Sequence, residues 1–199
     1  MRPLTTGILL FDGVEELDFA GPFEVFTTAK KEGDDVVTIA VTADPITGFN
    51  GLKVVPDHGF SDAPALDVLV VPGGMGTRKL ADDAAHIDWI KKVAADCTWV
   101  TSVCTGAILL NSAGLLAGRR VTTHWAYVDT LREQPDLTVV DDERYVRDGN
   151  VVTAAGVSAG IDMSLWLVGQ MYDIDHARAV QRVIEYDPAP PYALTEERA

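Results

Sequence analysis

The stretch Val100-Thr101-Ser102-Val103-Cys104-Thr105-Gly106-Ala107-Ile108-Leu109-Leu110 decides the fold of this chain. Its first half is rich in β-branched residues and predicts a buried strand. Its second half changes from small to aliphatic residues and predicts a helix that begins directly afterwards. Cys104 therefore falls on a sharp strand-to-helix turn, the geometry that presents the nucleophile in other α/β enzymes.

A cysteine on such a turn faces the free N–H groups and the positive dipole end of the following helix. This environment favours the thiolate, so Cys104 is a candidate nucleophile with a lowered pKa. The alternative is a small core residue, because free cysteine is among the residue types most often buried. The position on the turn favours the nucleophile.

Strand-like and helix-like segments alternate along the rest of the chain. The predicted strands span residues 4–11, 36–42, 67–71, 99–103, 120–123, 138–140, 145–147 and 151–153. The predicted helices span residues 22–31, 81–95, 106–113, 127–133, 161–172 and 175–184, and a small hairpin is expected within 46–60. This alternation predicts an α/β fold with a doubly wound, mostly parallel sheet and helices on both faces.

The bulk composition indicates a globular protein. The chain has 199 residues, of which 47% are hydrophobic, and we expect a single domain over residues 1–199 with a flexible tail at about 193–199. No apolar run approaches the roughly 20 residues that cross a bilayer. The first residues show neither a long apolar core nor a cleavage site of a signal peptide, so a cytoplasmic location is expected.

The spacing of the two cysteines predicts their redox state, and the net charge limits the classes of binding partner. Cys97 and Cys104 flank one predicted strand and should be about 20 Å apart, so both are expected to be free thiols. The net charge of −14 repels phosphate backbones and anionic lipids, which argues against nucleic acid and membrane surfaces as partners.

Four predicted loops leave the carboxyl ends of strands, where open α/β sheets carry their sites. They hold residues 12–18, the turn Pro72-Gly73-Gly74, the pair Cys104-Thr105, and the pair His124-Trp125. Glycine lets backbone approach a ligand closely, so the amides of Gly73, Gly74 and Thr105 are predicted to form an oxyanion-type hole beside the sulfur.

These motifs resemble the ThiJ/PfpI superfamily. The shared features are Leu17-Asp18 with Gly21-Pro22, Val71-Pro72-Gly73-Gly74, Cys104 on its turn, and Thr122-Thr123-His124. The resemblance runs from about residue 4 to residue 190 and implies a flavodoxin-like sheet.

Within that superfamily the chain is most similar to the isonitrile hydratase-like branch. The stretches that carry this similarity are 101–106, 122–127, 156–162 and 185–191. The branch implies a cysteine-dependent lyase that adds water to an isonitrile and gives an N-substituted formamide, without a cofactor and as a homodimer. The same signature resembles the N-terminal domains of AraC-type regulators, so a non-catalytic ligand sensor is the alternative. Another superfamily chemistry, glyoxalase-like or that of a redox-sensing chaperone, also remains open.

The resemblance assigns roles to individual residues. It places the carboxylate of Asp18 beside the thiol, where the neighbouring charge should raise its pKa and allow it to act as a general acid. Protease-like members carry His directly after the nucleophile; this chain has Thr105 there, so peptidase activity is not expected. His124 either contacts Cys104 or supports the site structurally. No His, Cys and Asp spacing suits a metal.

Overall fold

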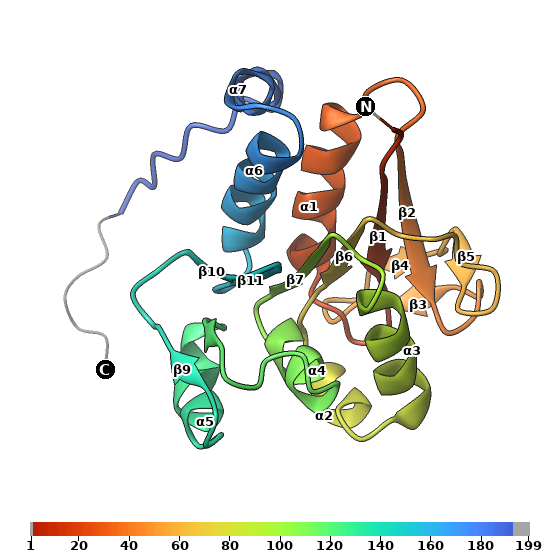
Figure 1. The fold of residues 1–199 in the computed structure, drawn as a ribbon, viewed down its shortest axis with the longest axis vertical. Coiled ribbons are helices and arrows are strands. Elements are labelled where there is room, and N and C mark those ends of the chain that lie inside the picture. Colours follow the sequence, from red (N-terminus) through yellow and green to blue (C-terminus); the bar gives the residue numbers. More distant parts are fainter. Residues whose placement is uncertain (1, 193–199) are drawn as a thin grey trace.

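The computed structural model describes residues 2–192, so the tail predicted at 193–199 lies outside the described residues. A seven-stranded sheet forms the centre of the fold (Figure 1). Its strand order is β10 (Tyr145–Asp148), β11 (Val151–Ala154), β7 (Trp99–Val103), β6 (Val68–Val71), β1 (Thr5–Leu9), β2 (Asp35–Ala40) and β5 (His58–Gly59). Neighbours pair in parallel except β10 with β11, which are antiparallel.

Helices cover both faces of this sheet, which confirms the predicted doubly wound α/β fold. On one side lie α1 (Glu16–Ala29), α6 (Ala159–Met171) and α7 (Ile174–Val183), and on the other α2 (Thr77–Leu80), α3 (Ala84–Ala94) and α4 (Gly106–Ser112) (Figure 1). Every residue of β6 is buried. A parallel strand covered on both faces has no solvent side, which explains its unbroken run of Val and Leu.

Two small sheets lie outside the main one. The hairpin expected within 46–60 is present as β3 (Ile46–Thr47) and β4 (Lys53–Val54), while β5 continues the main sheet. The strand predicted at 120–123 is only β8 (Arg120–Val121), and it pairs with β9 (Thr138–Val139) rather than with the main sheet. A 3₁₀ turn (Trp125–Tyr127) and α5 (Val128–Arg132) follow β8.

The first helix begins earlier than the sequence predicted. Pro22 was taken as a residue of the first turn, where proline is favoured, but α1 starts at Glu16 and contains Pro22 in its interior. Proline has no N–H, so the carbonyl four residues earlier, that of Asp18, lacks its usual helical partner. Asp18 consequently lies in the first turn of a helix and not in a loop.

The helix predicted at 81–95 is also different, because Asp83 divides it. The side chain of Asp83 accepts a 3.1 Å hydrogen bond from the backbone N–H of His86 and begins α3 as its N-cap. The short α2 precedes this break. An Asp directly before a helical pattern is a start signal, and Asp83 lies inside the range predicted as one helix.

The described residues contain no helix that is both long and apolar enough to span a membrane.

Candidate active site

Cys104 lies on the predicted elbow between β7 and α4. Its φ is +55°, a left-handed conformation that costs a non-glycine residue roughly 1–2 kcal/mol. Two backbone contacts hold it there, because its N–H is 3.1 Å from the carbonyl oxygen of Ala154 and 2.9 Å from that of Ala155. The side chain is 7% exposed. Cys104 is thus a nearly buried thiol on a strained turn.

Gly106 makes this turn possible. A Cβ at Gly106 would lie 2.0 Å from the carbonyl oxygen of Val71 at the end of β6. Since that neighbour is backbone and cannot give way, only glycine lets α4 begin so close to the sheet.

Asp18 is the buried carboxyl group of the site. It is fully buried, and its Oδ2 accepts a 2.8 Å hydrogen bond from the N–H of Gly73. Within residues 2–192, no donor forms a well-aligned hydrogen bond to Oδ1 of Asp18. Burial raises the pKa of Asp18 to about 7, with a further increase from the charge of Glu15, while the Gly73 N–H and the Cys104 thiol act in the opposite direction.

The pKa of Cys104 is raised, and the expected lowering is wrong. Burial is the main cause, and the charge of Asp18 adds to it, which brings the pKa to about 12. The N–H groups of Thr105 and Val157 and the Thr105 hydroxyl favour the thiolate but do not offset burial. The helix N-terminus alone would lower the pKa, but the cost of desolvating the sulfur is larger.

Cys104 and Asp18 therefore form a coupled acid pair. Each group interacts with the other, and at pH values above about 7 they hold one proton between them. In this state the carboxylate can take the thiol proton as the sulfur attacks and can return it later. Such a pair can combine a nucleophilic sulfur with a group that carries its proton.

The amides of Gly73 and Gly74 do not form the predicted oxyanion hole. The Gly73 N–H is bonded to Asp18, and the Gly74 N–H donates to the Thr105 hydroxyl at 3.0 Å. Both amides fix side chains of the site. The backbone donors that face the sulfur are those of Thr105 and Val157.

Val157 is a site residue that the sequence analysis missed. It lies in the turn between β11 and α6 with a φ of +40°, although it is β-branched. Its N–H reaches the sulfur of Cys104 because β11 is the parallel neighbour of β7. The small residues after β11 signal a tight helix start, but only the strand order brings that turn beside Cys104.

His124 is half-buried beside the elbow. Its Nδ1 accepts a 3.2 Å hydrogen bond from the N–H of Ala126, and its ring packs on Gly156, where a Cβ would be 2.5 Å from Cδ2. Burial, followed by the charge of Arg78, lowers the pKa of His124. Thr123, the residue before His124, contacts Cys104, because its hydroxyl donates to the Cys104 carbonyl at 2.8 Å. These contacts favour a supporting role for His124.

Comparison with known proteins places this site in a family. The family model described as the DJ-1/PfpI family matches residues 6–170. The chain belongs to the DJ-1/PfpI family. It is 44% identical to an isonitrile hydratase of Pseudomonas putida over 191 residues, which cover 95% of this chain and 81% of that protein.

Two further proteins, one known from a crystal structure and one a transcriptional regulator, are similar to this DJ-1/PfpI chain. A crystal structure of a ThiJ/PfpI family protein from Pseudomonas syringae superposes with a TM-score of 0.90 at 36% identity and covers 96% of this chain and 78% of that one. The transcriptional regulator GbdR of Pseudomonas aeruginosa is 26% identical over 94% of this chain, but the match spans only 52% of the regulator.

Two cavities lie near the turns of this DJ-1/PfpI chain. One, of about 370 Å³, abuts the elbow because it is lined by Thr123 and Val157, which contact the Cys104 carbonyl and sulfur respectively. His124 and Trp125 also line it. The other, of about 1160 Å³, lies along α6, α7 and the segment 186–190, and neither Cys104 nor Asp18 lines it. Neither Cys104 nor Asp18 lines the smaller cavity either, but two of its lining residues contact Cys104.

His86 and Trp125 differ in exposure. His86 is buried, pairs with Asp83 through Nδ1 and packs its ring edge-on to Phe60. Trp125 is 72% exposed. A histidine on a helix face can face inward or outward, and the sequence pattern does not distinguish them.

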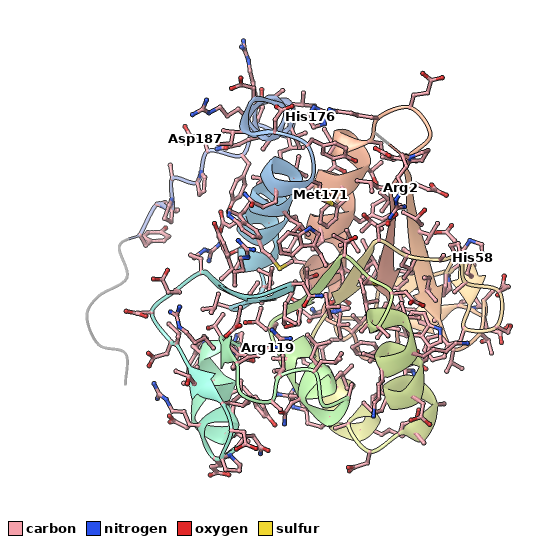
Figure 2. The ribbon with its side chains drawn as sticks, in the orientation of Figure 1. Arg2, His58, Arg119, Met171, His176 and Asp187 are labelled. Carbon is pink, nitrogen blue, oxygen red and sulfur yellow. The ribbon has the colours of Figure 1, made fainter. Side chains whose placement is uncertain are left out.

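The remaining histidines do not converge. Figure 2 shows His58 beside β5 and His176 on α7, at separate edges of the molecule. Among the residues that the structure describes, no group of three or more His, Cys, Asp or Glu side chains is arranged to hold a metal ion. Cys97 and Cys104 are both free thiols.

Proposed function

We propose that this protein is an isonitrile hydratase, which converts R–N≡C and water into R–NH–CHO. The observation that carries the proposal is the coupled pair of Cys104 and Asp18, in a chain 44% identical to a hydratase of that name. An isonitrile carbon accepts one nucleophile and one proton, and the pair supplies both. The Thr105 and Val157 amides favour the negative charge on the sulfur before attack.

The first half of the reaction forms a covalent adduct. Cys104 loses its proton to Asp18 as its sulfur bonds to the terminal isonitrile carbon. Asp18 then delivers that proton to the same carbon. The product is a thioimidate, R–N=CH–S–Cys104, and the carboxylate is ionised again.

The second half hydrolyses the adduct. Asp18 takes a proton from water as the water oxygen bonds to the thioimidate carbon, and it then passes that proton to the nitrogen. The carbon–sulfur bond breaks as the hydroxyl of the adduct loses its proton and becomes the carbonyl, and Asp18 returns this second proton to the sulfur. One isonitrile and one water give one N-substituted formamide, and the reaction needs no cofactor.

The direct test is turnover of benzyl isonitrile in water enriched in ¹⁸O. The proposal predicts N-benzylformamide that carries one ¹⁸O atom, measured by mass spectrometry. Absence of the formamide at high protein concentration overturns the proposal. Methylglyoxal, offered in parallel, tests the glyoxalase-like alternative.

The match to GbdR supports a second candidate, a ligand-sensing domain. A sensor binds an isonitrile or another small molecule without turning it over, so the same assay separates the two. We place the protein in the cytoplasm as a homodimer without nucleic acid or membrane partners. Light scattering tests the dimer, because a mass near 21.4 kDa would indicate a monomer.

A further inference from the structure

The Thr105 hydroxyl lies in a crowded network next to Cys104. Its oxygen accepts from the Gly74 N–H at 3.0 Å and lies 3.3 Å from both the Thr77 hydroxyl and Nη1 of Arg78. The Thr105 hydroxyl can itself donate to the Gly74 carbonyl oxygen, which is 3.3 Å away. A hydroxyl has two acceptor sites and a single proton. The direction of that proton therefore depends on which neighbours accept it.

The Gly74 carbonyl is a poor acceptor for the Thr105 proton. It already accepts from the Thr77 hydroxyl at 2.8 Å and from Nη1 of Arg78 at 2.8 Å. A carbonyl oxygen has two lone pairs, and these two shorter bonds occupy both. The guanidinium bond is charge-assisted, which makes it the stronger kind. The Thr77 oxygen, 3.3 Å away, is a second acceptor, and the sulfur of Cys104 is the third, since the Thr105 hydroxyl favours its ionised form.

Arg78 is held in place for this contact. It extends from α2 and lies over the ring of Tyr127, with 5.5 Å between its Cζ and the ring centroid. Across residues 2–192 it forms no ion pair with a carboxylate. In a protein of net charge −14, a guanidinium that bonds one carbonyl and the hydroxyls of Thr77 and Thr105 is unusual, since acidic partners are abundant.

We propose that Arg78 is a positioning residue for the Cys104 nucleophile. It occupies the Gly74 carbonyl and the acceptor side of the Thr105 hydroxyl, and so directs the Thr105 proton to the sulfur. The developing thiolate then receives a hydroxyl donor in addition to its two backbone amides. Arg78 acts through Thr105 and touches neither the sulfur nor the substrate.

Four charged or titratable groups face the Cys104 and Thr105 pair. Asp18 and Glu15 approach from the start of α1, Arg78 from α2, and His124 from the segment after β8. Asp18 disfavours the thiolate, whereas Arg78 carries the opposite charge. Removal of Arg78 therefore leaves the sulfur with acidic neighbours and a hydroxyl free to turn to the Gly74 carbonyl.

The test is the pH dependence of iodoacetamide alkylation at Cys104, followed by peptide mass spectrometry in the full-length protein. Arg78→Gln should move the profile upward by about half to one pH unit. At pH 7 alkylation should slow about threefold. The thiolate fraction falls further than that, but a more basic thiolate is also more nucleophilic, which offsets part of the loss. Arg78→Lys should fall in between, because an ammonium group can donate to the carbonyl without the planar fork.

Two further variants decide the route. Lys79→Gln removes the same charge one position along α2 and should leave the profile unchanged. Thr105→Val should move the profile upward, and Arg78→Gln should add no further shift in that background. An unchanged profile in Arg78→Gln, an equal shift in Lys79→Gln, or an undiminished shift in the Thr105→Val background each overturns the proposal. Alkylation uses no isonitrile, so the result stands whether or not the protein turns over that substrate.

Discussion

The backbone N–H of Gly73 donates a 2.8 Å hydrogen bond to Oδ2 of Asp18, and this bond joins the first turn of α1 to the turn after β6. This bond satisfies one oxygen of a fully buried carboxyl group. Among the described residues, the other oxygen, Oδ1, has no well-aligned hydrogen bond. A buried oxygen without a partner is costly to keep. We interpret it as the oxygen that exchanges a proton with Cys104.

Replacement of Asp18 should remove most of the activity. Asp18→Asn keeps the shape of the side chain and an oxygen for the Gly73 N–H but cannot carry the proton. A positioned general acid contributes about 10²–10⁴-fold, and the initial rate of formamide formation should fall by that factor. Turnover at the wild-type rate would show that the carboxyl group moves no proton.

The same substitution should stabilise the fold at alkaline pH. The pKa of Asp18 rises from an ordinary 3.8 to about 7 in the folded protein, so the folded state binds more protons than the unfolded state between those values. The free energy of unfolding therefore falls as pH rises from about 4 to about 7, by up to about 4 kcal/mol from this group. Urea titration at pH 8 should show Asp18→Asn more stable than the wild type, with little or no advantage at pH 4.

The pH–rate profile should reflect the coupled pair. Attack requires one shared proton, a state that forms as pH rises through the Asp18 pKa of about 7. The value of kcat/KM should rise through that pH and then reach a plateau, because the second proton leaves only near the raised pKa of Cys104. The rising limb should be absent from the residual activity of Asp18→Asn. A wild-type profile that is flat from pH 5 to 9 contradicts this assignment.

A methyl group at Gly73 should disrupt the site. Its Cβ would lie 2.5 Å from the Thr105 backbone nitrogen, 2.7 Å from Thr105 Oγ1 and 2.9 Å from Asp18 Oδ2. Because one of these neighbours is backbone, Gly73→Ala should move Asp18 and Thr105 apart. We expect a loss of turnover of about tenfold or more and a lowered melting temperature.

Gly118→Ala is the matched control for that substitution. Gly118 has a φ of +74° and open space around the position of a Cβ. Alanine there should cost only about 1 kcal/mol of backbone strain and leave kcat/KM unchanged. Equal losses of activity in both variants would show that Gly73 has no special relation to the site.

The sequence predicted the elbow because its signals are local. A β-branched run followed by Cys104, Thr105 and Gly106 contains both the strand and the helix start, and the structure places Cys104 between β7 and α4 as expected. Asp18 was assigned to the site only through the family resemblance, and the structure places it in a coupled pair with Cys104. Its position in a helix was missed because Pro22 was taken to mark the helix start.

Other features depend on tertiary neighbours and have no local signal. Val157 and Arg78 reach the elbow only because β11 and α2 pack beside it. The raised pKa of Cys104 follows from burial, which a pattern of residue types does not quantify. Gly73 and Gly74 were expected to present their amides beside the sulfur, but these amides bond Asp18 and Thr105.

The central claim is that Cys104 is the nucleophile of an isonitrile hydratase. The most direct measurement is the initial rate of N-benzylformamide formation from benzyl isonitrile by Cys104→Ser and by Cys97→Ser. Cys97 is an equally buried free thiol away from the Asp18 pair, so its variant is the matched control. We predict a loss of about a hundredfold or more in Cys104→Ser and a rate near that of the wild type in Cys97→Ser. A Cys104→Ser variant that hydrates the isonitrile as fast as the wild type would contradict the account.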